Sequence, residues 1–135
     1  MRFKAFTMER LFRALADRTR LRILNLIGDQ ELCVCYFVEI LGVSQPKISR
    51  HLAYLRNVGI VNARSDGKWM HYKLVKPENE AAMQILNDLL AWMRDDPAMR
   101  RDRARLNTAC CLPERFVTLH NAPRPAKLVP LLERG

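Results

Sequence analysis

The sequence contains no apolar run long enough to cross a membrane. A transmembrane helix needs about 20 consecutive, mostly apolar residues, and no stretch of the 135 residues approaches that length. Residues 1–7 also lack the apolar segment of a secretory signal. We therefore expect a cytoplasmic protein without a membrane partner. In that compartment disulfides are rare, and closely spaced cysteines indicate metal binding or redox sensing.

The signatures of common enzyme classes are missing as well. The chain has no glycine-rich phosphate loop and no Ser/His/Asp set. It also lacks the Cys-x-x-Cys motif and the βαβ pattern of thioredoxin-like oxidoreductases. We therefore expect no catalytic residue and no catalytic cofactor, and we keep a thiol-dependent enzyme as the less favoured alternative.

Acidic residues are scarce in the middle of the chain. Residues 41–76 contain seven lysines and arginines and one acid, Asp66, so this segment has a net charge of +6 out of +9 for the whole chain. Lysines and arginines that neutralise phosphates release condensed counterions, which favours association with a polyanion. The charge distribution therefore predicts a nucleic-acid partner for this segment.

Apolar residues at helical spacing predict two scaffold helices, over residues 8–16 and 18–27. Asp17 is placed to cap the second helix, and Gly28 is placed to end it. A later helix over residues 81–94 carries a broad apolar stripe. A second copy of the same helix is the simplest surface to cover such a stripe, so we expect a homodimer.

The central segment predicts a helix-turn-helix unit. Apolar residues at positions i, i+3, i+4 and i+7 from Val34 to Leu41 form the inner face of its first helix. Gly42 begins a tight turn, and Ser44 is placed to cap the second helix over residues 45–58. Two short helices joined by a glycine-containing turn are the helix-turn-helix arrangement.

Two strands are predicted after this unit, over residues 60–64 and 68–74, with Asp66-Gly67 as a hairpin signal between them. A helix-turn-helix followed by a basic hairpin is the order of a winged helix. We therefore predict a mainly α-helical, dimeric winged helix-turn-helix protein with a two-stranded β wing.

Three regions are expected along the chain. Residues 1–96 form the DNA-binding and dimerisation domain, because Asp96-Pro97 marks a break in the helical pattern. Residues 97–111 form a C-terminal helical extension that carries Cys110 and Cys111. Residues 112–135 contain four of the seven prolines and are predicted to be a flexible tail.

Three motifs, in order, carry a family resemblance. They are Glu31-Leu-Cys-Val-Cys35, Ser44-Gln-Pro-Lys-Ile-Ser-Arg-His-Leu52 and Gly67-Lys-Trp-Met-His-Tyr-Lys73. Together they resemble the ArsR/SmtB family of winged-helix metal-responsive repressors, in particular its arsenic-sensing branch, over about residues 8–94. The resemblance implies a dimeric repressor that binds double-stranded operator DNA with two half-sites and is released by trivalent arsenic or antimony.

The sequence departs from that family at the thiolate site. Family members commonly have Asp after the second cysteine, and some have a third cysteine three positions after it, but this chain has Tyr36 and Val38 there. A pair near the C-terminus could supply the missing thiolate, from the same or the partner subunit. The predicted metal ligands are Cys33, Cys35, Cys110 and Cys111.

The number of thiolates leaves the inducer open. Three sulfurs in a trigonal arrangement suit As(III), whereas four suit cadmium, lead or zinc. A cadmium- or lead-responsive repressor and a thiol-redox-responsive repressor, both of the same fold, are therefore alternatives.

Helical geometry leads to a hypothesis about release. A helix turns about 100° per residue, so Cys33 and Cys35 are expected to lie about 200° apart, on either side of the inward-pointing Val34. One ion with bonds near the roughly 2.3 Å of zinc to sulfur cannot reach both. We therefore expect ligand binding to unwind the start of this helix and to displace the recognition helix that packs on it.

The predicted DNA contacts come from the second helix of the helix-turn-helix unit and from the wing. Residues near the N-terminal end of such a helix reach base edges, and basic wing residues reach the backbone or the minor groove. His71, on a predicted strand, is expected to be solvated or to face DNA. The predicted DNA-binding residues are Ser44, Gln45, Lys47, Ser49, Arg50, His51, Arg64 and Lys68.

Overall fold

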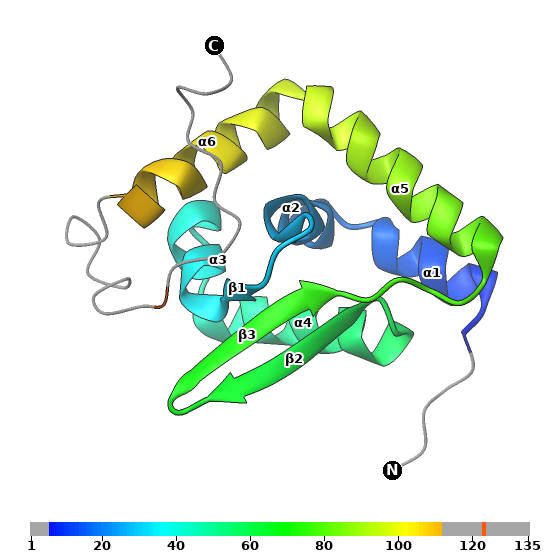
Figure 1. The fold of residues 1–135 in the computed structure, drawn as a ribbon, viewed down its shortest axis with the longest axis horizontal. Helices are drawn as coiled ribbons and strands as arrows, with labels where there is room; N and C mark the ends of the chain where they lie inside the picture. Colours follow the sequence, from blue (N-terminus) through cyan, green and yellow to red (C-terminus); the bar gives the residue numbers. More distant parts are fainter. Residues whose placement is uncertain (1–5, 112–122, 124–135) are drawn as a thin grey trace.

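The computed structural model describes residues 6–111 and residue 123; the predicted tail otherwise lies outside the described residues, as does the side chain of Cys111. The described part consists of six helices and a small sheet, and the β2–β3 hairpin projects from one edge of the helical part (Figure 1). The elements are α1 Met8–Leu15, α2 Arg18–Ile27, β1 Leu32–Cys33, α3 Val34–Leu41, α4 Gln45–Val58, β2 Val61–Asp66, β3 Trp69–Leu74, α5 Glu80–Asp95 and α6 Pro97–Cys111.

Local signals set the helix ends close to where the sequence predicts them. Asp17 caps α2 by accepting a hydrogen bond at Oδ1 from the Arg20 backbone N–H, at 3.3 Å. Gly42 ends α3 with a φ of +65°, a left-handed conformation that suits glycine. Ser44 occupies the N-cap position of α4, but its side chain makes no capping hydrogen bond. Its position is confirmed, and its expected cap interaction is not formed.

The sheet has three strands, whereas the sequence predicted two. β2 and β3 form the hairpin, and their last pair, Asp66 with Trp69, leaves Gly67-Lys68 as the two-residue turn. The additional strand, β1, pairs antiparallel with β3, so that the strand order is β1-β3-β2. A strand of two residues is too short to show alternation in the sequence, which explains why it was not predicted.

The core lies between α2, α3, α4 and the hairpin. Phe37 and Leu41 are buried as predicted, but Val34 and Val38 are only half-buried. The additional inner positions of α3 are Tyr36 and Ile40, which are 0% and 1% exposed. The helix packs on α4 and also on α6, so its buried face is broader than a stripe against one neighbour.

Helix α6 folds back across α2 and α3 after the break at residues 96–97 (Figure 1). Its side chains Met99, Leu106 and Ala109 are buried in the same core as the rest of the described chain. A bidentate ion pair connects it to α2, because Arg22 donates to both carboxylate oxygens of Asp102 at 2.7 and 2.9 Å. The segment expected as an extension therefore packs as a core helix.

Candidate thiolate site and nucleic-acid interface

Cys33 and Cys35 lie together at the junction of β1 and α3. Cys33 is the N-cap of α3, with extended backbone angles of φ −70° and ψ 145°, and Cys35 lies in the first turn. Their Sγ atoms are 3.1 Å apart. The expectation that helical geometry separates these thiols is wrong, because Cys33 precedes the helix. A soft ion can bridge both sulfurs without unwinding α3.

The two thiols share a hydrogen bond that makes one of them acidic. Cys35 donates to Cys33, and this bond lowers the pKa of Cys33 to about 7 despite the opposing effect of burial. The same bond, together with burial, raises the pKa of Cys35. Near neutral pH the pair therefore provides one readily formed thiolate, which is the form that binds soft ions.

Cys110 approaches the pair from α6. It is fully buried and lies near the hydroxyl of Tyr36, the residue that follows Cys35; that hydroxyl has no hydrogen-bond partner among the described residues. Burial raises the pKa of Tyr36, and the neighbouring thiols of Cys110, Cys35 and Cys33 raise it further. The three cysteines with described side chains are thus grouped around one tyrosine.

These sulfurs do not yet form a closed metal site. Among the described side chains of residues 6–110, no three His, Cys, Asp or Glu groups are close enough together to hold an ion. Cys33 and Cys35 are therefore a preformed pair, whereas Cys110 is near them but separate. The prediction for the Cys111 side chain concerns atoms outside the described residues.

Five of the predicted DNA-binding residues lie on the outer surface at the start of α4. All five are exposed, as expected for a helix that is presented to a groove. They are Ser44, Gln45, Lys47, Ser49 and Arg50.

His51 differs from this exposed group. It is half-buried, and its Nδ1 lies 3.3 Å from Nη1 of Arg20 on α2. The Arg20 guanidinium also stacks 4.2 Å from the centre of the Tyr54 ring and donates to the Ala14 carbonyl at 2.8 Å. Arg20 therefore fixes α4 against the scaffold. The sequence did not indicate this role, because an arginine on a scaffold helix has the same pattern as a solvated one.

The wing residues have different surroundings. Lys68 is exposed in the hairpin turn, with its Nζ 5.1 Å from the centre of the Trp69 ring. Arg64 is exposed but pairs with Glu31 at 2.6 Å, and this ion pair lowers the pKa of Glu31. The expectation for His71 is wrong, because its side chain is 7% exposed and the residue pairs with Cys33 across the sheet. The β1 strand covers this position, and β1 was not predicted.

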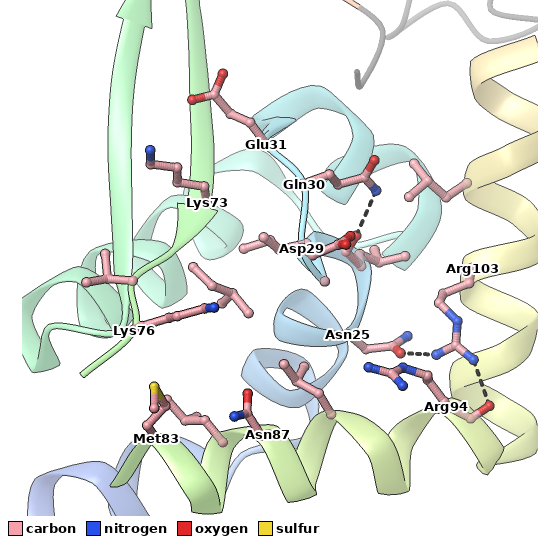
Figure 2. Close-up of a pocket in the computed structure, with 18 of the residues that line it drawn as sticks. Asn25, Asp29, Gln30, Glu31, Lys73, Lys76, Met83, Asn87, Arg94 and Arg103 are labelled. Atoms are coloured by element: carbon pink, nitrogen blue, oxygen red, sulfur yellow. Dashed lines mark hydrogen bonds between the residues drawn. The ribbon is translucent and has the colours of Figure 1, made fainter. Parts of the chain in front are cut away.

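A cavity of about 890 Å³ lies away from the cysteines, between the end of α2, β3, α5 and α6 (Figure 2). On its wall, Arg103 donates to the Asn25 side chain and to the Arg94 carbonyl, the latter at 2.7 Å. None of the described cysteines lines it. The thiol pair is therefore not part of this cavity.

Comparisons with known proteins connect these features. A family model described as bacterial regulatory protein, arsR family, matches residues 17–63, which include both helices of the helix-turn-helix unit and the Cys33–Cys35 pair. The arsenical resistance operon repressor of Escherichia coli (strain K12) is 45% identical over 101 residues, covering 72% of this chain and 85% of that protein. The chain belongs to the ArsR family of bacterial regulatory proteins. The predicted resemblance is confirmed, and this ArsR-family chain is a DNA-binding transcriptional regulator, not an enzyme.

Solved structures agree with the ArsR-family fold. HlyU from Vibrio cholerae N16961 is 32% identical, covers 62% of this chain and 88% of its own, and has a TM-score of 0.55. The AntR antimony-specific transcriptional repressor is 26% identical, with 68% and 86% covered and a TM-score of 0.51. The predicted winged helix, mainly α-helical with a β wing, is confirmed. No helix among the described residues is long and apolar enough to span a membrane.

Proposed function

We propose that this ArsR-family chain is a homodimeric repressor that leaves its operator when trivalent arsenic or antimony binds Cys33 and Cys35. The observation that carries the proposal is the 3.1 Å separation of two thiols at the start of α3, the first helix of the DNA-binding unit. Thiolates select soft ions over hard ones. The names of the arsenical resistance repressor and of the antimony-specific AntR support the metalloid class.

The C-terminal cysteines complete the site in this proposal. Cys110 is the described candidate for the third thiolate, because it lies near Tyr36, the residue next to Cys35. Cys111 is the further candidate, and either residue can come from the same or the partner subunit. Arsenous acid carries three hydroxyls, so three thiols that form three As–S bonds release three waters. The product is a neutral trigonal thiolate complex.

The dimer is proposed from apolar surface that a single chain leaves exposed. Trp92 on α5 is 76% exposed, and Met8 and Phe12 on α1 are 71% and 51% exposed. Ile85 and Leu89 on α5 are only half-buried. These exposed apolar side chains on α1 and α5 support association with a second copy, and a two-fold dimer would present two copies of α4 to two half-sites.

Titration of the protein–DNA complex with candidate inducers tests the inducer class. The protein is bound to a fluorescent operator duplex, and anisotropy follows release during additions of arsenite, antimonite, cadmium, lead or peroxide. We expect arsenite and antimonite to release the DNA at concentrations close to that of the protein. Release by cadmium and lead alone would favour the divalent-metal alternative, and release by peroxide alone would favour a redox repressor.

Arg50→Ala tests the DNA-reading surface. Arg50 is exposed on α4, and an arginine that reads a base contributes roughly 1 to 3 kcal/mol to specific binding. We expect a loss of that size on the operator and a smaller loss on unrelated DNA, both measured by anisotropy. Arg56→Ala, which removes an exposed charge at the other end of α4, is the matched control. An equal loss on both DNAs would instead identify Arg50 as a phosphate contact.

A further inference from the structure

Helix α6 packs against α3 and lies near both of its ends. Near the start of α3, the buried Cys110 lies close to Tyr36 where the two helices pack together. Five residues earlier on α6, Arg105 reaches the other end of α3, where it donates from Nη1 to the Ile40 carbonyl at 2.5 Å and from Nη2 to the Glu39 carbonyl at 3.5 Å. Helix α6 therefore lies near the thiolate site at the start of α3 and also contacts the C-terminal end of α3.

The Arg105 contacts occur where α3 turns into the recognition helix. The last carbonyls of a helix lack partners within that helix, and a cation placed there is favourable. The Gly42 N–H donates to the Val38 carbonyl, and Arg105 supplies donors to the Ile40 and Glu39 carbonyls. Because α4 begins a few residues later, these hydrogen bonds hold the α3–α4 turn in its present geometry.

Ion binding at the cysteine thiols is expected to disturb the hydrogen bonds of Arg105. Cys110 is near Cys33 and Cys35, but the three do not form a closed site in this arrangement. To join an ion held by the pair, Cys110 must move toward the start of α3. The Arg22–Asp102 ion pair anchors α6 to α2, so the part of α6 beyond Asp102, which contains Arg105 and Cys110, is the part free to shift. Arg105 lies on the same rigid helix and moves with Cys110.

We propose that Arg105 is a positioning residue that couples the thiolate site to DNA binding. Its hydrogen bonds to Ile40 and Glu39 stabilise the DNA-binding arrangement of α3 and α4, and ion binding by Cys33, Cys35 and Cys110 breaks them. This inference rests on the proposed function, because it requires Cys110 to join the bound ion. It adds an explanation of how ion binding at the thiols changes the position of α4.

If the protein switches between two states, loss of Arg105 should change operator affinity and arsenite affinity in opposite directions. A residue that stabilises only the DNA-binding arrangement shifts the population toward that state. Its loss must weaken operator binding and, by the same shift, strengthen arsenite binding to the free protein. A residue that merely supports the fold would weaken both when it is removed.

The test compares Arg105→Ala with Arg101→Ala, an exposed arginine on the same helix whose loss changes the net charge equally. Operator affinity is measured by anisotropy, and arsenite affinity by the ultraviolet absorbance of the arsenic–thiolate bonds in the absence of DNA. Hydrogen bonds from a charged donor are worth enough that we expect about tenfold weaker operator binding and severalfold tighter arsenite binding for Arg105→Ala. Arg101→Ala should stay within about twofold of the unmodified protein on both measures.

A second variant separates coupling from loss of folding. Arg105→Lys keeps the charge and one donor direction, so it should recover part of the operator affinity, and thermal melting reports whether each variant is folded. If Arg105→Ala weakens arsenite binding, or leaves operator binding unchanged, the inference is wrong. Failure of the proposed function is seen separately, in an unmodified protein that arsenite does not release from DNA.

Discussion

Cys33→Ser abolishes release by arsenite and leaves operator binding within about twofold of the unmodified protein. The Cys33 side chain is 1% exposed and faces Cys35 rather than DNA, and serine is close to cysteine in size. A serine hydroxyl stays protonated at neutral pH and does not bind soft ions. Removal of one of two linked ligands costs about a hundredfold or more in apparent affinity, so arsenite at concentrations that release the unmodified protein should have no effect.

Cys110→Ser with Cys111→Ser is the companion variant. If Cys110 or Cys111 supplies the third thiolate, this double variant should respond much more weakly to arsenite but retain the initial capture by the Cys33–Cys35 pair. Operator anisotropy and arsenic–thiolate absorbance measure the two effects on the same samples, and circular dichroism verifies the fold. An unchanged response would remove the C-terminal cysteines from the site, and a normal response of Cys33→Ser would remove the central pair.

Asp102→Ala lowers the free energy of unfolding by about 3 kcal/mol, because it leaves the Arg22 guanidinium without its partner. The Asp102 side chain is 6% exposed and Arg22 is 27% exposed, so the pair is largely shielded from water. The hydrogen bond to Asp102 raises the pKa of Arg22. A guanidinium stays charged without such a partner, so Asp102→Ala leaves a half-buried, unpaired charge. For a chain of this size the midpoint of thermal unfolding should fall by roughly 10 °C.

Urea denaturation followed by circular dichroism measures this effect. Because α6 shares the core with α2 and α3, we expect one cooperative transition at a lower urea concentration. Asp95→Ala is the control, since that exposed carboxylate should contribute less than about 0.5 kcal/mol. A main transition that is unchanged in Asp102→Ala would mean that α6 unfolds independently of the DNA-binding unit.

The helices could be predicted from the sequence because their signals are local. The apolar spacing of α2 and α4 and the capping position of Asp17 depend only on residues within a few positions of each other. The conformation of Cys33 could not be predicted in this way. It depends on the pairing of β1 with His71 and Tyr72 in a distant part of the chain, and a short apolar run is equally compatible with strand and helix.

The candidate site was predictable in its chemistry but less so in its arrangement. Cys33 and Cys35 are recognised by type and spacing alone. The approach of Cys110 depends on α6 folding back over α3, which requires the long-range contacts of Asp102 with Arg22. Arg20 and Arg105 were not predicted as positioning residues, because an arginine on a helix surface has the same sequence pattern whether it is solvated or bound to a neighbouring carbonyl.

The pairing of β1 with β3 also determines which length changes the wing can tolerate. Side chains alternate between the two faces of a strand, so one residue inserted within β3 would turn His71 to the opposite face and move the partner of Cys33 out of register. Residues inserted at Gly67-Lys68 would leave this ladder intact, because the turn lies beyond the last strand pair. Natural or engineered variants can therefore lengthen the tip of the wing to alter DNA contacts, while the number of residues from His71 to the end of β3 has to stay constant.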